Sequence, residues 1–325
     1  MDIDRILAGD RRALARWLTA LEGERPEAQA VLSALYSRTG RAHLVGVTGA
    51  PGSGKSTLVA ALARAWRARG ETVAVLAVDP SSPFSGGAIL GDRVRMQSLA
   101  GDPGVFIRSM ASRGTLGGLA ATTADLARAL DAAGFDLVVI ETVGAGQSEI
   151  DVARAAQTTI VIEAPGLGDD VQAIKAGILE IADLLVVNKA DQPGAEATAR
   201  ALKAALELEQ AARVGTRDAA HWSVLVLNTI ATSGQGVEEV VAAIAAHRSF
   251  LKDTPHGSDR ERQRVRRELE SRLRQRVWQH FTVDFEMSVL EELAAKVCAR
   301  EIDLESAVKS ALSSRRTNES ESSPP

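Results

Sequence analysis

Cysteine is almost absent from the sequence, since Cys298 is the only one among 325 residues. A single cysteine excludes an internal disulfide and fits a reducing compartment. No apolar run approaches the roughly 20 residues that a membrane-spanning helix needs. The charged start, Met1-Asp2-Ile3-Asp4-Arg5, also lacks the apolar stretch of a secretory signal. We therefore expect a cytoplasmic protein that does not enter a membrane.

Aromatic residues and net charge are low as well. Phe, Trp and Tyr make up 3% of the chain, and the formal net charge is −4. A weakly acidic chain has no global basic field for nucleic acid, so we expect no nucleic-acid partner. The five histidines are scattered without the spacing of metal ligands. Hydrophobic residues still make up 45% of the chain, enough for one large core with smaller helical additions.

The strongest motif lies at residues 49–56. The segment Gly-Ala-Pro-Gly-Ser-Gly-Lys-Ser matches G-x-x-x-x-G-K-[ST], the phosphate-binding loop of nucleoside triphosphatases. It follows an apolar strand pattern and precedes a helical one, which is the context the motif requires. Backbone N–H groups and the helix N-terminus of such a loop bind phosphate oxygens. The candidate nucleotide-binding residues here are Gly49, Gly52, Ser53, Gly54, Lys55, Ser56 and Thr57.

Two of these residues have specific predicted roles. Lys55 is expected to neutralise the β- and γ-phosphates, and the Ser56 hydroxyl is expected to ligate Mg²⁺. The motif therefore predicts a nucleoside triphosphate and Mg²⁺ as ligands.

A second motif, Asn188-Lys189-Ala190-Asp191, ends another aliphatic strand and matches the N-K-x-D base loop of GTPases. Asp191 can accept two hydrogen bonds from the guanine N1–H and N2–H₂ groups, a donor pair that adenine lacks. Asn188 is expected to tie the base loop to the phosphate loop, and Lys189 to cover the face of the base. GTP is therefore favoured over ATP.

The segment Asn228-Thr229-Ile230-Ala231 stands where GTPases often have a Ser-Ala pair below the base. That loop acts partly through backbone N–H groups, so Ile230 does not exclude binding. We expect Ala231 to be the residue that contacts guanine O6.

Glu141 ends the apolar strand pattern at residues 137–141 and is followed by Thr142, Val143 and Gly144. An acid at this position holds the hydrated Mg²⁺ of such enzymes, and the N–H of Gly144 can approach the γ-phosphate. The candidate catalytic residues are thus Lys55, Glu141 and Gly144. Small GTPases have a water-orienting Gln directly after this glycine, whereas Gln147 of this chain is out of register. We expect slow unassisted hydrolysis and a partner that completes the site.

Two further acids can approach the Mg²⁺ shell. Asp79 stands at the end of the strand pattern at residues 72–78, before a loop rich in Pro and Ser. Asp92 follows that loop. For Asp92, a helix cap or a surface position explains the residue almost as well.

Aliphatic strands alternate with Ala-rich helical patterns through the middle of the chain. This alternation predicts an α/β fold with a doubly wound, mainly parallel sheet of the P-loop NTPase type. The expected strands are 43–48, 72–78, 105–108, 137–141, 159–163, 184–188 and 224–228. The expected domains are an N-terminal helical extension at 1–40, the nucleotide domain at 41–252, a C-terminal helical arm at 253–312 and a disordered tail at 313–325.

Residues 78–93, 106–114 and 141–149 form three long and specific segments. They resemble the MeaB/ArgK/MMAA family of GTPases associated with methylmalonyl-CoA mutase. The likeness runs from about residue 40 to about residue 250 and, more loosely, through both helical ends. Glu in place of Asp at position 141 is normal in this family. The resemblance implies that the phosphate and Mg²⁺ site consists of Lys55, Ser56, Asp79, Asp92 and Glu141.

The same resemblance implies a metallochaperone for an adenosylcobalamin-dependent acyl-CoA mutase. Such a protein binds the mutase, uses GTP to gate delivery of intact cofactor and helps to remove damaged cofactor. GTP or GDP and Mg²⁺ are then its own ligands. Adenosylcobalamin is expected to be bound by the mutase, because this chain has no D-x-H-x-x-G cobalamin signature. An adenosyltransferase is a further candidate partner. Methylmalonyl-, isobutyryl-, ethylmalonyl- and 2-hydroxyisobutyryl-CoA all stay open as substrates of the mutase.

Residues 165–175 resemble the additional switch of this family. The candidate switch residues are Gln147, Asp169, Asp170 and Lys175. From the residues alone, a strand-to-helix turn capped by Asp169 explains the segment equally well.

Residues 259–276 are rich in Arg, and an apolar residue stands at every fourth position from 265 to 277. The apolar positions are Val265, Leu269, Leu273 and Val277. This spacing indicates a helix with one apolar face, suited to dimerisation or docking. The family that the chain resembles forms dimers through C-terminal helical arms, so we expect a homodimer.

Two other functions compete with the mutase chaperone. A nickel-insertion GTPase often carries a His-rich or Cys-containing metal segment, and this sequence has none. A P-loop kinase uses the same phosphate loop, but it needs an acceptor pocket with a positioned base, and guanine selectivity argues against it.

Overall fold

The computed structural model describes residues 2–80, 96, 99, 101–112, 118–142, 148–166, 178–212, 221–283 and 287–321. The chain divides into two compact units, Met1–Arg266 and Arg267–Pro325. The first unit holds the sheet and both nucleotide motifs. The second holds the later part of one long helix and the helices that follow it.

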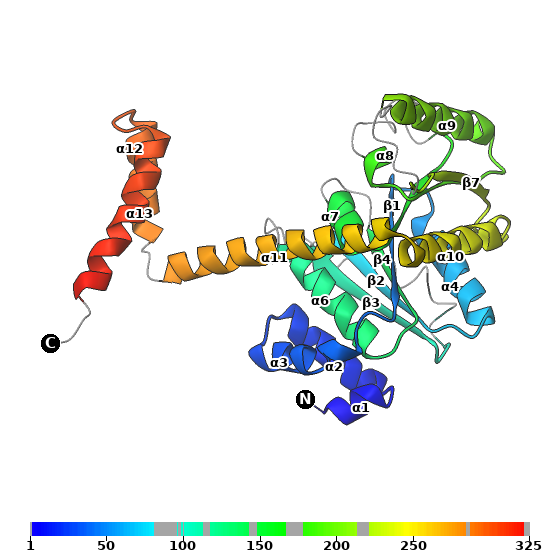
Figure 1. Ribbon diagram of the computed structural model, residues 1–325, viewed down its shortest axis with the longest axis horizontal. Helices are drawn as coiled ribbons and strands as arrows, with labels where there is room; N and C mark the ends of the chain where they lie inside the picture. The colour runs from blue at the N-terminus through cyan, green and yellow to red at the C-terminus, as the bar shows by residue number, and fades with distance from the viewer. Residues whose placement is uncertain are drawn as a thin grey trace. The chain divides into compact units, whose positions relative to one another are not determined.

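Seven parallel strands form a single sheet in the first unit, in the order β3-β2-β4-β1-β5-β6-β7 (Figure 1). The strands are β1 His43–Gly49, β2 Val73–Pro80, β3 Val105–Ser112, β4 Leu137–Thr142, β5 Thr158–Glu163, β6 Leu184–Asn188 and β7 Leu225–Thr229. Each of the seven predicted strands is present within a residue or two at its start. The prediction of a doubly wound, parallel sheet is confirmed.

β1 lies at the point where the strand order reverses. β4 pairs with one of its edges and β5 with the other, so Val47 lies beside Glu141 and Gly49 beside Ile162. In open parallel sheets, ligands bind outside the carboxyl ends of the strands at such a reversal. The topology therefore places the phosphate loop, which follows β1, at the expected ligand crevice.

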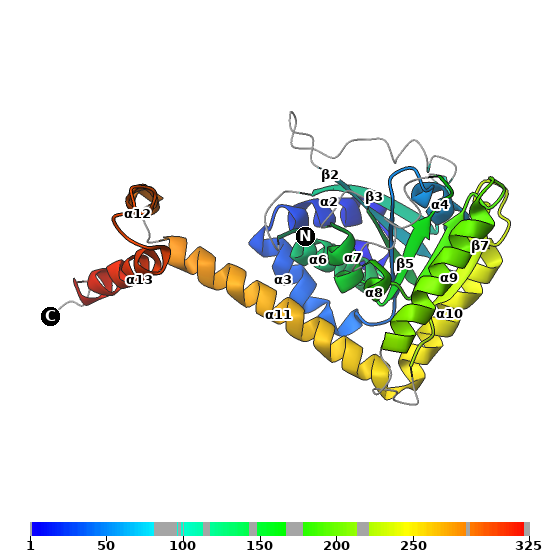
Figure 2. The same cartoon turned by 90° about the horizontal axis from the view of Figure 1, so that it is seen from above.

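Strand side chains alternate between two helical layers. One face, which includes Val45, Val47 and Leu184, packs against α4 Lys55–Ala68 and α10 Val237–Asp253. The other face packs against α6 Gly118–Ala132, α7 Ser148–Ala155, α9 Ala195–Ala212 and the N-terminal helices. Figure 2 shows β2 and β3 between the layer that contains α6 and the layer that contains α4. Short α8, Ile178–Ile181, leads into β6. Within the described ranges, no helix combines the length and apolar character needed to cross a bilayer.

The N-terminal helices belong to the main core and are not a separate unit. They are α1 Ile3–Leu7, α2 Arg11–Glu22 and α3 Pro26–Ala34, followed by a short 3-10 turn, Tyr36–Arg38. α3 begins at Pro26, which takes the first helical position, where its missing N–H is harmless. Trp17 of α2 is fully buried in the same cluster as α6, and its indole N–H donates to the carbonyl of Ala28 at 3.1 Å.

Asp131 of α6 joins this helical layer to β1. Its carboxylate accepts hydrogen bonds from the N–H groups of Gly40, Arg41 and Ala42, at 2.5, 3.1 and 2.8 Å. Three backbone donors are thereby satisfied where the extension enters the sheet.

The C-terminal helices differ from the expected limits. They are α11 Pro255–Val283, α12 Met287–Cys298 and α13 Leu304–Glu321. α11 begins at Pro255, because proline is well suited to the start of a helix. α13 continues to Glu321, past the predicted start of a disordered tail at 313, since residues 313–321 contain neither Gly nor Pro. The two compact units meet after Arg266, within α11, and not at residue 252.

β1 and α7 approach each other so closely that only glycine fits between them. A Cβ atom on Gly46 would lie 2.8 Å from Cγ1 of Val152 and 2.9 Å from Cβ of Ala156. The end of α7 is also fastened to β1, because the N–H of Gln157 donates to the carbonyl of Leu44 at 2.9 Å.

We predict that Gly46→Val lowers the free energy of unfolding by about 1–3 kcal/mol, the usual effect of overpacking a filled core. Urea denaturation of the whole chain measures this change. Gly101→Ala is the matched control, because a Cβ there meets nothing within 4 Å, and it should change stability by less than about 0.5 kcal/mol. Equal stability of the two variants would refute the tight β1–α7 contact.

Candidate nucleotide-binding site

The phosphate loop joins the carboxyl end of β1 to the N-terminus of α4. Gly49 and Gly54 have positive φ angles of 137° and 90°, a region that side chains other than glycine rarely adopt. A Cβ on Gly49 would lie 2.0 Å from the carbonyl oxygen of Ile162, and one on Gly54 would lie 2.4 Å from Nδ2 of Asn188. Both glycines are thus required by backbone conformation and by the close approach of other strands.

Lys55 lies in the first turn of α4 and is buried. Its ammonium group donates hydrogen bonds to the carbonyls of Gly49 and Ala50, each at 3.0 Å. These bonds hold the positive charge within the curl of the loop. Loops of this type bind phosphate oxygens at that position.

Ser56 and Glu141 meet at the base of the loop. The Ser56 hydroxyl donates to Oε1 of Glu141 at 2.6 Å, and both residues are buried. The contact follows from the register of β1 and β4, which places Glu141 beside Val47. Next to it, the Thr142 hydroxyl hydrogen-bonds with that of Thr48 at 3.1 Å.

A buried hydroxyl and a carboxylate are oxygen donors of the kind that Mg²⁺ prefers. The pair of Ser56 and Glu141 therefore fits a hydrated Mg²⁺ beside bound phosphates. Within the described part of the chain, no group of three or more His, Cys, Asp or Glu side chains could form a metal site on its own. A Mg²⁺ here would complete its shell with water and phosphate oxygens, as Mg²⁺ usually does.

Asn188 connects the phosphate loop to the segment at the end of β7. It ends β6 and is 2% exposed. Its Nδ2 group donates to the carbonyl of Ser53 at 2.8 Å. Its Oδ1 atom accepts hydrogen bonds from the Thr229 hydroxyl and from the N–H of Ala231, each at 3.1 Å. The structure thus contains the link between base loop and phosphate loop that the sequence predicts.

The remaining base-loop residues lie at the surface beside Asn188. Lys189 is half-buried with a φ angle of 58°, and Asp191 is exposed. The N–H of Ala190 donates to the carbonyl of Thr229 at 3.0 Å, which holds the loop against β7. Ala231 is buried, and its N–H, predicted to contact guanine O6, donates to Asn188.

The rest of the phosphate loop is also placed. Gly52 is exposed, Thr57 is half-buried in the first turn of α4, and Ser53 is buried. The Ser53 hydroxyl has no hydrogen-bond partner among the described atoms. Several predicted residues cannot be compared in this way: the side chain of Asp79 and all of Gly144, Asp92, Gln147, Asp169, Asp170 and Lys175 lie outside the described residues.

Sequence reasoning missed one residue of this network. Thr229 supplies the second hydrogen bond to Oδ1 of Asn188, and it is fully buried. Its place one residue before the expected Ser-Ala pair was the available signal, but a hydroxyl there has no fixed role in the base-loop motif.

Three comparisons relate this chain to known proteins. A family model described as methylmalonyl Co-A mutase-associated GTPase MeaB matches residues 14–286. A protein of Pyrococcus horikoshii that is named as a GTPase is 44% identical over 303 residues, which cover 93% of this chain and 93% of that protein. GTPase ArgK of Escherichia coli is 41% identical over 253 residues, covering 77% and 76% of the two chains.

A solved structure shares the whole architecture. The crystal structure of an LAO/AO transport system kinase superposes with a TM-score of 0.70 and 26% sequence identity, and the match covers 97% of this chain and 96% of that chain.

We predict that Asn188→Ala weakens GDP binding at least tenfold, which corresponds to about 1.4 kcal/mol. The substitution removes three hydrogen bonds and leaves the Ser53 carbonyl and the Ala231 N–H without this partner. Isothermal titration calorimetry measures the affinity. Asn228→Ala is the matched control, because Asn228 is exposed one residue before Thr229. Wild-type affinity in Asn188→Ala would show that the amide does not organise the site.

Proposed function

This chain belongs to the MeaB family of methylmalonyl Co-A mutase-associated GTPases, and we propose that it uses GTP hydrolysis to control an adenosylcobalamin-dependent acyl-CoA mutase. In this role it gates the loading of intact cofactor and protects or reactivates the mutase. The observation that carries the nucleotide part of the proposal is the Asn188 amide, which joins a phosphate loop to a guanine-type base loop. The mutase part is supported by the family name.

The residues of the site have separable roles in hydrolysis. Lys55 holds positive charge where the β- and γ-phosphates bind, and Asp191 accepts the guanine N–H groups. Ser56 and Glu141 would hold Mg²⁺, which supplies charge neutralisation at the phosphates when it is bound. The N–H of Gly144 is proposed to reach the γ-phosphate.

Hydrolysis is proposed to be slow until the mutase completes the site. The sequence has Ala145 where small GTPases have a water-orienting Gln. The segments proposed to respond to nucleotide are 79–96, which includes Asp79 and Asp92, 142–149, and 166–175. The mutase can be regulated only as far as it binds the two nucleotide states with different affinity.

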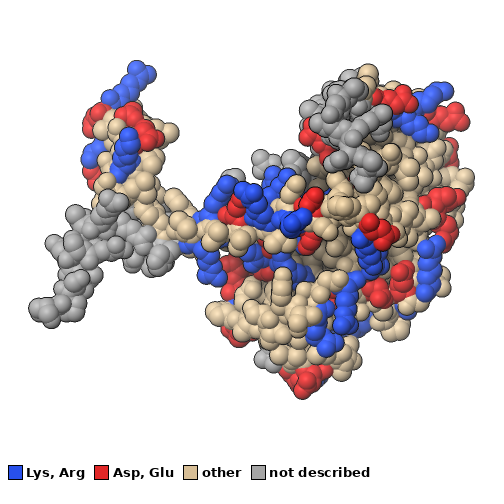
Figure 3. Space-filling model, viewed as in Figure 1, with Lys and Arg blue, Asp and Glu red and all other residues tan. Residues whose placement is uncertain are grey.

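The C-terminal arm is the proposed surface for dimerisation or docking. On α11 the large apolar side chains Val265, Leu269, Leu273 and Val277 are 46%, 57%, 54% and 67% exposed. Lys and Arg atoms gather along the same helix (Figure 3). Exposed apolar residues at every fourth position mark a face that a second helix can cover. A homodimer through this arm, with an adenosyltransferase as a further partner, belongs to the proposal.

The competing functions have less support. The similar solved structure is named as a kinase, and a kinase would transfer the γ-phosphate to an acceptor other than water. For nickel insertion, the described residues offer no cluster of three metal-binding side chains. Release of inorganic phosphate from GTP distinguishes hydrolysis from transfer.

We predict that saturating partner mutase raises the rate of phosphate release from GTP at least tenfold. The reason is that the mutase is proposed to complete the water-positioning groups, because Ala145 stands where small GTPases have a Gln. A continuous phosphate assay with and without the mutase measures the effect. Lys55→Ala serves as the control for contaminating GTPases, because it removes the charge that binds the phosphates. A rate that no cobalamin-dependent mutase changes would remove the partner from the proposal.

We predict that Asp191→Asn shifts selectivity from guanine to xanthine nucleotides. An amide NH₂ can donate to the xanthine 2-oxo group, whereas the carboxylate pairs with the guanine donors. Competition between GDP and XDP for the purified protein gives the preference, which should change by at least tenfold. Unaltered preference would mean that the base lies elsewhere.

A further inference from the structure

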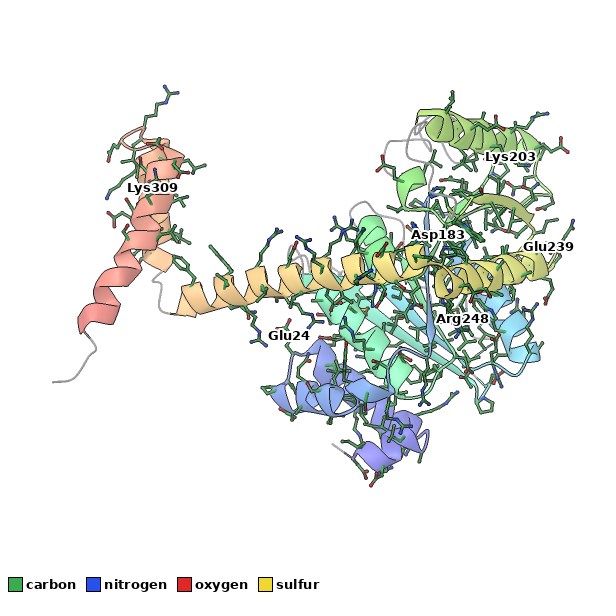
Figure 4. The ribbon with its side chains drawn as sticks, viewed as in Figure 1. Glu24, Asp183, Lys203, Glu239, Arg248 and Lys309 are labelled. Carbon is green, nitrogen blue, oxygen red and sulfur yellow. The ribbon has the colours of Figure 1, made fainter. Side chains whose placement is uncertain are left out.

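Four buried polar side chains and one half-buried arginine form a chain at the end of the sheet opposite the nucleotide motifs. His43 begins β1, Thr158 begins β5 and Asp183 directly precedes β6. His247 comes from α10 and Arg260 from the first turns of α11. Figure 4 labels Asp183 close to the junction of α10 and α11. The mechanism proposed above uses none of these five residues.

Thr158 stands between the two imidazoles. Its hydroxyl oxygen is 2.7 Å from Nε2 of His43 and 2.8 Å from Nδ1 of His247. The second nitrogen of His247, Nε2, lies 3.5 Å from Oδ1 of Asp183. His247 is 0% exposed, and the Trp222 ring packs on it with centroids 4.7 Å apart.

Asp183 also binds the first turns of α11. Its two carboxylate oxygens accept hydrogen bonds from Nη1 and Nη2 of Arg260, at 2.6 and 2.8 Å. The N–H of Thr159 donates to Oδ2 at 2.8 Å. One buried carboxylate therefore has two neighbours that can be cationic: the guanidinium of Arg260, in bidentate contact, and the imidazole of His247, at a longer distance.

The carboxylate determines the orientation of the hydrogen bonds in the chain. A neutral imidazole has one N–H donor and one acceptor, and the nitrogen that faces a carboxylate carries the proton. Nε2 of His247 therefore carries the proton, facing Asp183 without a hydrogen bond, and Nδ1 is the acceptor. The Thr158 hydroxyl then donates to His247 and accepts from Nε2–H of His43.

The charges around His247 oppose one another. Burial lowers the pKa of His247 to about 4; the charge of Asp183 raises the pKa, while the charges of Arg260 and His256 lower it. Among these charges, that of Asp183 is the one that favours an imidazolium at His247. The groups that oppose it come from α11.

At the other end of this row of polar side chains, burial and the charges on α10 keep His43 neutral. Burial lowers the pKa of His43 to about 3, and the charges of Arg248, His247 and Lys252 on α10 lower it further. The side chain of Gln157 hydrogen-bonds to His43 and acts in the opposite direction.

We propose that Asp183 is a switch with two alternative partners, and that release of the first turns of α11 is linked to uptake of a proton by His247. In the state described here, the guanidinium of Arg260 occupies the carboxylate. When Arg260 withdraws, a proton from solvent binds Nδ1 of His247, and the imidazolium replaces the guanidinium as the partner of the buried charge. A buried carboxylate left without either partner would be strongly unfavourable.

The hydrogen bonds reverse in a balanced way during this exchange. Nδ1–H of protonated His247 donates to the oxygen of Thr158, whose own hydroxyl proton turns to Nε2 of His43. His43 releases its Nε2 proton to solvent and takes another on Nδ1, so the net gain is the one proton on His247.

The linkage has a definite sign. The pKa of His247 in the closed state, about 4, is below the ordinary value near 6.5. Attachment of α11 is therefore strongest above pH 6.5 and weakens as the pH falls from 6.5 towards 4. By reciprocity, anything that draws the first turns of α11 away raises the pKa of His247.

The direct test is an NMR titration of the ¹⁵N-labelled imidazoles in the full-length, nucleotide-free protein. We expect the pKa of His247 to be at least one unit higher in Arg260→Met than in the wild type. Arg262→Met is the matched control, because Arg262 is exposed and hydrogen-bonds to Asp259 on the same helix; its His247 should titrate as in the wild type. An unchanged pKa in folded Arg260→Met would overturn the proposal.

A second measurement on the wild-type chain covers the case in which Arg260→Met does not fold. Hydrogen exchange of the amides at 258–266, corrected for intrinsic rates, should show protection that falls by up to tenfold per pH unit between pH 6.5 and pH 4. Asp183→Asn should abolish this pH dependence, because it removes the charge that attracts the proton. Protection that stays constant with pH in the wild type would contradict the linkage. Because no nucleotide or mutase is present, neither result depends on the proposed function.

Discussion

One buried amide holds the two halves of the nucleotide site together. The side chain of Asn188 binds the Ser53 carbonyl on one side and Thr229 and Ala231 on the other. β6, which carries Asn188, is separated from β1 by β5, so the amide reaches across a strand to the phosphate loop. The space it needs explains Gly54, since a Cβ there would lie 2.4 Å from Nδ2 of Asn188. Two sequence motifs that look independent are therefore one packed unit.

β6 joins this unit to the polar chain at the other end of the sheet. Asp183, which binds Arg260, directly precedes the strand, and Asn188 is its last residue. The strand is buried throughout, and its side chains pack in the layers of α10 and α9. The carboxyl end of the sheet thus carries the proposed nucleotide site, while a residue at its amino end binds the first turns of α11.

Much of the fold could be predicted from the sequence, because apolar strands and Ala-rich helices alternate without interruption. The phosphate loop, the base loop and Glu141 could be predicted because each lies at a recognisable strand end. The end of α13 was misjudged, because a polar segment without Gly or Pro can continue a helix. The membership of the N-terminal helices in the main core depends on tertiary packing of Trp17, which local patterns do not encode.

The histidines show a different limit of sequence reasoning. His43 and His247 are far apart in the chain and have no motif spacing, yet β1, β5 and α10 bring both to the hydroxyl of Thr158. Only the topology reveals that cluster.

The measurement that tests the central claim most directly is a crystal structure of the protein with GDP and Mg²⁺. The account predicts phosphates enclosed by residues 49–56, with guanine against Asp191 and Asn188 still bound to Ser53. GDP bound at any other place, or a phosphate loop separated from Asn188, would contradict it.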